Sequence, residues 1–178
     1  LSNKNIFSVV KPDKGGSLVE LSHRKSCLNL TDVLARREEA YHKKTPQTQQ
    51  NAGAQGAAIP SIHDISRTCD ATDKLVYDPC PRYSFSDRIW PDKNTDAARR
   101  LCHLPFEVCS KTQNAVSLKT ITPCGVLVQK TFSINKGADL KVNYLIKPEK
   151  TPSEDFRFGT ELNLSLLAGH DEGRFYLL

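Results

Sequence analysis

Carboxylates are the first residues to consider, because two of them placed about 5–10 Å apart across a sugar can cleave a glycosidic bond. The candidates are Asp64, Asp78, Asp87 and Glu161, and their positions in the sequence do not select a pair. The sequence contains no glycine-rich phosphate loop, no GxSxG turn and no HExxH metal motif. The residues alone therefore predict no catalytic set, no cofactor and no metal site.

A second group of candidates could bind a carbohydrate without catalysis. His63 and Asp64 lie in the apolar segment 62–65, and a carboxylate can orient an imidazole for proton transfer. On a strand, however, neighbours point to opposite faces, which favours a structural role for that pair. Tyr83 and the single tryptophan, Trp90, offer rings that could stack on a sugar. A lone tryptophan beside a proline is also typical of a core or domain-contact residue.

Six cysteines are present, and no CxxC or CxxH spacing joins any of them. The spacing favours free thiols, leaves disulfides open and gives metal ligation the least support. Their positions are Cys27, Cys69, Cys80, Cys102, Cys109 and Cys124.

The composition is that of a globular domain with a mixed surface. A chain of 178 residues fits one domain, or part of a larger one. The net charge of +5 is spread without a block of like charges, which predicts a solvated surface and no nucleic-acid partner. No long apolar run predicts a membrane span, and the first residues do not resemble a signal peptide. Because the sequence contains no methionine, we expect a fragment or an excised domain.

The fold prediction is organised around the stretch 156–169, FRFGTELNLSLLAG. Over its first eleven residues, 156–166, one side of an extended chain alternates strictly with the other, which is the pattern of a strand with one buried and one solvated face. The residues expected on the buried face are Phe156, Phe158, Thr160, Leu162, Leu164 and Leu166.

Further strands joined by short turns predict a mainly β fold, an antiparallel β-sandwich. Turn sequences at 11–16, 123–125 and 135–137 favour hairpins. In the strand 126–134 the apolar residues share one face, and Lys130 intrudes on it. The other predicted strands are 6–10, 17–21, 106–110, 115–122 and 140–147.

Two short helices are predicted beside the strands. Residues 29–43 place apolar side chains at three- and four-residue steps, with Asn29 as N-cap. A helical turn within 82–90 would use Ser84 and Asp87 as a capping box. The segment 45–60, rich in Gln, Ala and Gly, is predicted to be a flexible loop.

Four stretches in this order resemble the C-terminal domain of glycoside hydrolase family 57, the α-amylases and 4-α-glucanotransferases. They are 15–21 (GGSLVEL), 29–42 (NLTDVLARREEAYH), 61–65 (SIHDI) with 77–87 (YDPCPRYSFSD), and 158–169 (FGTELNLSLLAG). The resemblance covers residues 6–178, apart from 90–104 and the Gln/Ala-rich loop. One departure is Ser22, where the family usually has an aspartate.

The resemblance implies a galactose-mutarotase-like supersandwich over 1–178, incomplete because the family domain continues past Leu178. It also implies a partner, an N-terminal (β/α)7 barrel that holds the catalytic carboxylates of a retaining reaction. This chain would then be a non-catalytic domain that supports the barrel and lines part of the α-glucan site. The alternative is a stand-alone carbohydrate-binding or protein-interaction module. The family implies a cytoplasmic location, although six cysteines leave a secreted origin open.

The candidate carbohydrate-binding residues are Tyr83, Trp90, His63 and Asp64.

Overall fold

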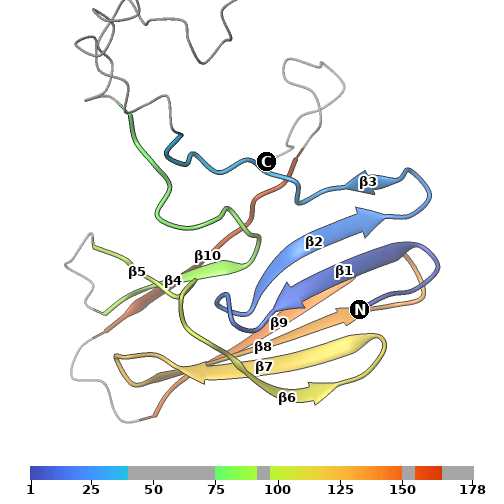
Figure 1. Ribbon diagram of the computed structural model, residues 1–178. Helices are drawn as coiled ribbons and strands as arrows, with labels where there is room; N and C mark the ends of the chain where they lie inside the picture. The colour runs from blue at the N-terminus through green and yellow to red at the C-terminus, as the bar shows by residue number, and fades with distance from the viewer. Residues whose placement is uncertain (40–74, 92–96, 150–154, 166–178) are drawn as a thin grey trace, which may run out of the picture. The chain divides into compact units, whose positions relative to one another are not determined.

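The computed structural model describes residues 1–39, 75–91, 97–149 and 155–165. The chain divides into two compact units, one formed by Leu1–Val33 with Arg82–Leu178 and the other by Leu34–Pro81. All the described strands belong to the first unit, and Figure 1 shows their labels. The predicted loop 45–60 and the apolar segment 62–65 lie outside the described residues.

The first sheet contains the predicted N-terminal hairpin. Strands β1 (Ile6–Lys11) and β2 (Ser17–His23) pair antiparallel, and the short strand β3 (Leu28–Asn29) joins the free edge of β2. The turn between β1 and β2 contains Gly15 and Gly16, both with positive φ, as a glycine-rich turn permits.

The second sheet is the antiparallel series that the sequence predicts. It has the order β6 (Glu107–Lys111), β7 (Ala115–Ile121), β8 (Val126–Ile134) and β9 (Leu140–Pro148). Every second residue of β8, from Val126 to Ile134, is buried. This regular alternation confirms the predicted inner face of β8 and places Lys130 on it.

The third sheet contains the strand around which the prediction was organised. Its order is β10 (Arg157–Glu161), β4 (Ser86–Trp90) and β5 (Arg99–Arg100), again antiparallel. The described strand is shorter than predicted, because it ends at Glu161. Leu162, expected on the buried face, is 56% exposed. Residues 166–169 lie outside the described part.

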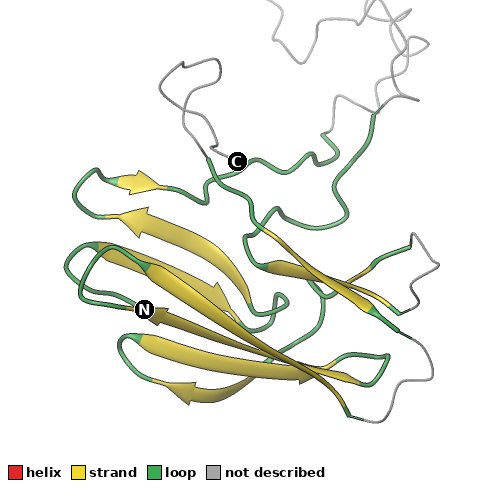
Figure 2. Cartoon of the chain, turned by 180° about the vertical axis from the view of Figure 1, so that it is seen from behind, coloured by secondary structure: helices red, strands yellow, loops and turns green. Residues whose placement is uncertain are grey.

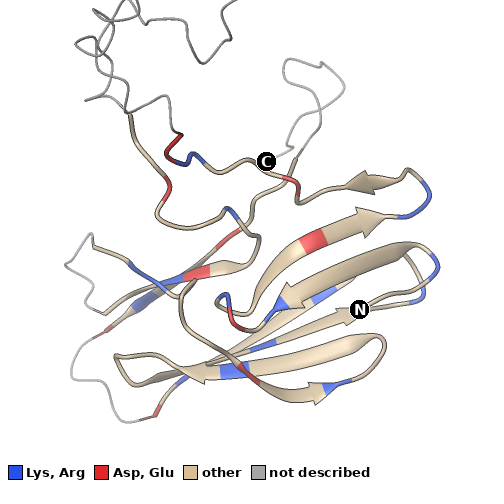
Figure 3. Cartoon of the chain, in the orientation of Figure 1, with Lys and Arg blue, Asp and Glu red and all other residues tan. Residues whose placement is uncertain are grey.

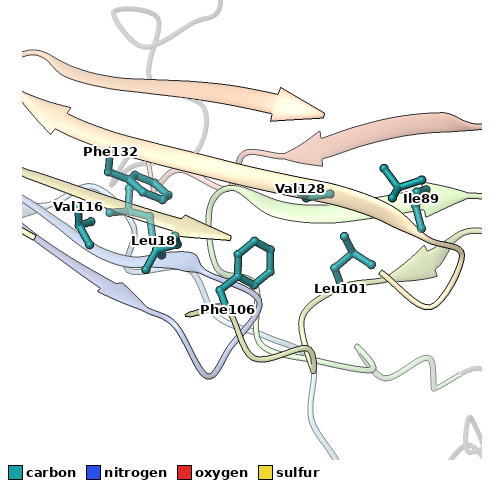
Figure 4. Packing of buried hydrophobic residues seen from close by; sticks show 9 residues of the cluster. Leu18, Ile89, Leu101, Phe106, Val116, Val128 and Phe132 are labelled. Atoms are coloured by element: carbon teal, nitrogen blue, oxygen red, sulfur yellow. The ribbon is translucent and has the colours of Figure 1, made fainter. Parts of the chain in front are cut away.

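The three sheets share one hydrophobic core in the first unit. Buried side chains from β2, β4, β7 and β8 meet there, together with Leu101 and Phe106 from the segment before β6. Figure 4 shows Leu18 of β2 and Phe132 of β8 facing each other across this core. The predicted antiparallel β-sandwich is therefore confirmed.

The helix predicted over 29–43 is wrong for its described part. Asn29 belongs to β3, and residues 30–39 contain no helix. The side chain that was expected to cap a helix instead accepts a hydrogen bond from Thr31 N at 3.0 Å, while Leu30 N bonds to Leu21 O at 2.8 Å. These bonds tie residues 29–31 to β2 in place of a helical turn. Leu34, expected on the apolar face of the helix, is 89% exposed.

The helical turn predicted within 82–90 is also wrong, because Ser86–Trp90 form strand β4. The backbone of Ser84 exchanges two hydrogen bonds with Leu18 of β2, at 2.9 and 3.0 Å. The Ser84 hydroxyl accepts a bond from Asn163 N at 3.0 Å, so it does not cap a helix. Figure 2, a view from behind, shows only strands and loops in the described chain, and none of it is a helix that could span a membrane.

Candidate functional site

Trp90 is the last residue of β4 and lies across β10. A Cβ added at Gly159 would come within 3.2 Å of the indole, so the ring occupies the space above that glycine. The Arg157 guanidinium lies 5.3 Å from the ring centroid, a cation–π distance. The indole is therefore half-buried against β10, where Gly159 makes room for it.

The structure does not bring the predicted carbohydrate-binding residues into one described site. Tyr83 precedes β4 and is held by its carbonyl, which accepts a bond from Asn163 Nδ2 at 3.1 Å. It therefore lies at the opposite end of β4 from Trp90. His63 and Asp64 lie outside the described residues.

The candidate carboxylates do not form a catalytic pair within the described residues. Asp78, in the second unit, binds Arg36 through a 2.9 Å ion pair. Asp87 is opposite Thr160 in the β4–β10 register, whereas Glu161 is opposite Ser86, so the two acids point to opposite faces of the sheet. The fourth candidate, Asp64, lies outside the described residues.

The most developed polar site is an ion pair on the inner side of β4. Asp87 Oδ2 lies 2.7 Å from the Nζ atom of Lys130 on β8, and both side chains are 0% exposed. Lys130, the charged residue on the otherwise apolar face of β8, therefore forms an ion pair with a carboxylate. A buried charge is costly unless it is paired and hydrogen-bonded, and this pair meets both conditions.

Three backbone carbonyls complete the surroundings of the Lys130 ammonium. Nζ donates to Gly15 O at 2.7 Å, Gly16 O at 3.2 Å and Phe85 O at 2.8 Å. An ammonium has three N–H donors, and four oxygen acceptors surround this one, the three carbonyls and Asp87 Oδ2 at 2.7 Å.

The residues that supply these carbonyls share an uncommon backbone conformation. The φ angles of Gly15, Gly16 and Phe85 are 69°, 57° and 55°. Glycine adopts this left-handed region without strain, whereas Phe85 does so at a steric cost. A Cβ at Gly15 would also lie 2.7 Å from Leu101 O, which leaves no space for a side chain. The glycine pair in the predicted turn is therefore required by the ammonium site and by close packing.

Aromatic and hydroxyl groups close the remaining sides of the site. Nζ lies 4.9 Å from the Phe106 ring centroid and 5.8 Å from that of Tyr144. Tyr144, on β9, donates its hydroxyl to Asp87 Oδ1 at 2.9 Å and lies 3.1 Å from Thr160 Oγ1. We call Lys130, Asp87, Tyr144 and the three carbonyls the ammonium cage.

Burial dominates the electrostatics of the cage. It raises the pKa of Asp87 and lowers the pKa of Lys130, and the charge of each partner opposes the shift of the other. Because three carbonyls need three N–H donors, the geometry favours the charged ammonium over the neutral amine. Burial, followed by the charge of Asp87, raises the pKa of Tyr144 well above its ordinary value.

The outer side of β4 carries a second and more open charge cluster. Arg88 forms an ion pair with Glu161, and Arg100 Nη1 lies 3.7 Å from the same carboxylate. Asn163 Nδ2 donates to the other carboxylate oxygen at 3.1 Å. Figure 3 shows acidic and basic positions next to each other on β4. Because successive residues of a strand point to opposite faces, Asp87 lies on the buried face and Arg88 on the outer face.

The cage links separate strands, and its two charged side chains are shielded from solvent. It joins the β1–β2 turn, the start of β4 and strands β8 and β9, and its two charged side chains are fully buried. The sequence carried one sign of it, the intrusion of Lys130 on an apolar face. It gave no sign that Asp87, interpreted as part of a capping box, is the partner.

The cysteine and metal hypotheses can be followed in the described chain only. Cys27, Cys80, Cys109 and Cys124 are free thiols, and Cys69 lies outside the described residues. In the same part of the chain, no group of three or more His, Cys, Asp or Glu residues is placed to hold a metal.

Comparison with known proteins identifies the family. A family model described as "Alpha-amylase/4-alpha-glucanotransferase, C-terminal" matches residues 1–178. An alpha-amylase of Pyrococcus abyssi is 36% identical over 177 residues, which cover 93% of this chain and 27% of that protein. A 4-alpha-glucanotransferase of Thermococcus kodakarensis is 29% identical over 175 residues, 93% of this chain and 26% of that protein.

A solved structure shows the same fold. The crystal structure of the 4-alpha-glucanotransferase from Thermococcus litoralis superimposes with a TM-score of 0.68 at 22% identity, over 92% of this chain and 26% of that one. The chain thus spans about a quarter of the length of these relatives. The resemblance noted in the sequence is confirmed: the chain belongs to the family of C-terminal domains of α-amylases and 4-α-glucanotransferases.

Proposed function

We propose that this chain is the non-catalytic C-terminal domain of a larger enzyme that hydrolyses or transfers α-glucans. The observation that carries this proposal is the family match over residues 1–178 in a chain that spans 26–27% of its relatives. The remaining three quarters of such a protein would hold the catalytic domain, an N-terminal (β/α)7 barrel.

The described carboxylates support a role without catalysis. A retaining glycosidase needs two carboxyl groups about 5–5.5 Å apart that both reach the sugar. Asp87 is sealed inside the ammonium cage, and Glu161 faces the other side of its sheet, bound to Arg88. We therefore place the nucleophile and the acid/base residue of the double displacement in the barrel.

The outer face of the third sheet supports a contact role for the domain. Trp90, Arg88, Arg100 and Arg157 lie on strands β4, β5 and β10 there, and Trp and Arg are the residue types most often found at interface hot spots. We propose that Trp90 contacts either the barrel or a glucan bound beside it. Tyr83, His63 and Asp64 remain candidates for the glucan-facing wall.

Deletion of this segment from the parent protein tests the supporting role. We expect the parent without these 178 residues to lose thermal stability and most of its activity on amylose, because the barrel surface that the domain covers becomes exposed. A truncated parent that keeps the melting temperature and kcat/KM of the full protein would contradict the proposal.

Two assays on this chain alone test the non-catalytic assignment and glucan binding. We expect no release of reducing sugar from amylose, and reducing-sugar release by the folded chain would overturn the proposal. Affinity electrophoresis in gels that contain amylose or glycogen tests binding, with Trp90→Ala as the variant. If Trp90 faces a glucan, the wild-type chain is retarded and the variant is not. Retardation equal in both would exclude Trp90 as a glucan contact.

A further inference from the structure

The ammonium cage has the composition of a cation-binding site. Four oxygen atoms lie 2.7–3.2 Å from Lys130 Nζ, three of them backbone carbonyls and one a carboxylate. Two aromatic rings, those of Phe106 and Tyr144, face the same nitrogen at cation–π distance. Carbonyl oxygens, one negative charge and ring faces together attract a cation.

The distances and the charge argue against small divalent cations. Separations of 2.7–3.2 Å match N–H···O hydrogen bonds, whereas Mg²⁺ needs oxygens at about 2.0–2.1 Å and Ca²⁺ at about 2.3–2.6 Å. The single carboxylate, Asp87, neutralises one positive charge. A divalent ion would leave a net charge buried, at a high desolvation cost.

Contacts that do not include the Lys130 side chain hold the three carbonyls and Asp87 in place. Gly15 and Gly16 are kept left-handed by a turn that packs against Leu101 and Phe106. Phe85 is held by its edge-to-face contact with Phe132, with ring centroids 5.7 Å apart. The Asp87 carboxylate is held from its other side by Tyr144. These contacts do not involve the Lys130 side chain.

We propose that the pocket formed by the carbonyls of Gly15, Gly16 and Phe85 with Asp87 is a binding site for a monovalent cation of the ammonium type, and that the chain fills it with its own Lys130. The positive charge is then the feature that the domain requires at this position. A free alkylammonium ion should occupy the pocket once the tethered ammonium is removed.

Lys130→Ala in this chain tests the proposal, because alanine keeps Cβ and the missing part of the side chain is n-propylammonium. We expect a lowered melting temperature that rises by several degrees, and saturates, as n-propylammonium chloride is added. The neutral analogue 1-propanol and equal concentrations of sodium chloride should not restore it. The wild type and Lys141→Ala, which removes an exposed lysine of β9, report the general effect of the salt.

Lys130→Met is the matched control for the pocket, since it fills the stem volume without a charge and should be destabilised but insensitive to n-propylammonium. The proposal is overturned if Lys130→Ala responds to n-propylammonium no more than Lys141→Ala does. If Lys130→Ala does not fold in plain buffer, the test is to refold it in the presence of n-propylammonium chloride and, separately, of 1-propanol. Recovery with the cation alone supports the site, and no recovery with either counts against it.

Discussion

The two faces of strand β4 carry the same types of charge in opposite surroundings. On the inner face, Asp87 meets Lys130, and both side chains are 0% exposed. On the outer face, Arg88 meets Glu161, with exposed fractions of 31% and 29%. In the buried pair, water cannot screen the charges, so the loss of one partner leaves an uncompensated charge. In the exposed pair, water solvates the charge that remains. Residues of one strand, adjacent in sequence, therefore contribute very differently to the stability of the domain.

Removal of the inner carboxylate should have the largest effect. Asp87→Ala leaves the buried Lys130 ammonium without its counter-ion, and we expect a loss of about 3–5 kcal/mol in the free energy of unfolding. Urea denaturation of the variant and the wild type measures this loss. Asp87→Asn keeps the shape of the side chain but not its charge, so it separates the contribution of the charge from that of packing. A loss below about 1 kcal/mol, the size typical of an exposed pair, would show that the cage is not a stabilising element.

Much of the fold was accessible from the sequence, because strand alternation is a local signal. The apolar face of β8 and the turns that flank it follow from residues close in sequence. The two predicted helices failed because distant partners decide those segments. Ser84 forms a β-bridge with Leu18 of β2, and Leu30, next to Asn29, bonds to Leu21 of the same strand.

The cage could not be predicted for the same reason. Its hydrogen bond from Lys130 to Gly15 spans 115 positions in the sequence. Only the intrusion of one lysine in an apolar series indicated that an inward charge needs a partner. For Trp90 the sequence allowed a sugar-stacking surface and favoured a core or domain-contact residue. The space above Gly159, which half-buries its ring, depends on a strand far along the chain.

The next largest loss of stability is expected at Gly15, which supplies one of the three carbonyls of the ammonium cage. Gly15→Ala places alanine in the left-handed region, which should lower the free energy of unfolding by about 1–2 kcal/mol. The new Cβ also clashes with Leu101 O, and overpacking of this kind typically costs about 1–3 kcal/mol more. Gly125→Ala is the matched control, since Gly125 also has positive φ but no atom within 4 Å of an added Cβ. Urea denaturation should show the larger loss at Gly15. Equal losses would show that backbone strain accounts for both variants and that the close packing around Gly15 adds nothing.

A smaller effect is expected at the hydroxyl that supports Asp87. Tyr144→Phe removes the donor to Oδ1 and keeps the ring, so we expect a loss of about 1–3 kcal/mol in the free energy of unfolding. Thermal or urea unfolding at neutral pH measures it.

Alkaline pH gives a second measure of Tyr144. Its folded pKa is raised, so its contribution to stability is full below the unfolded value of about 10 and is lost as the pH rises from there toward the folded pKa. Stability should therefore decrease less steeply above pH 10 in Tyr144→Phe than in the wild type. Identical slopes would show that the phenol is not held protonated by its surroundings.

The smallest effect is expected on the outer face. Glu161→Gln removes the charge that pairs with Arg88, and we expect a loss of about 0–1 kcal/mol that decreases further with added salt. Urea denaturation at low and high sodium chloride measures both. A salt-independent loss as large as that of Asp87→Ala would remove the distinction between the two faces.

The most direct test is a double-mutant cycle on each pair, with Asp87→Asn and Lys130→Met inside and Arg88→Met and Glu161→Gln outside. Each inner single variant should be strongly destabilised, because it leaves one buried charge alone, while the inner double variant should lose far less than the sum. The account predicts a coupling free energy of about 2–3 kcal/mol for the inner pair and under about 1 kcal/mol for the outer pair. An inner coupling no larger than the outer one would contradict the central role of the ammonium cage.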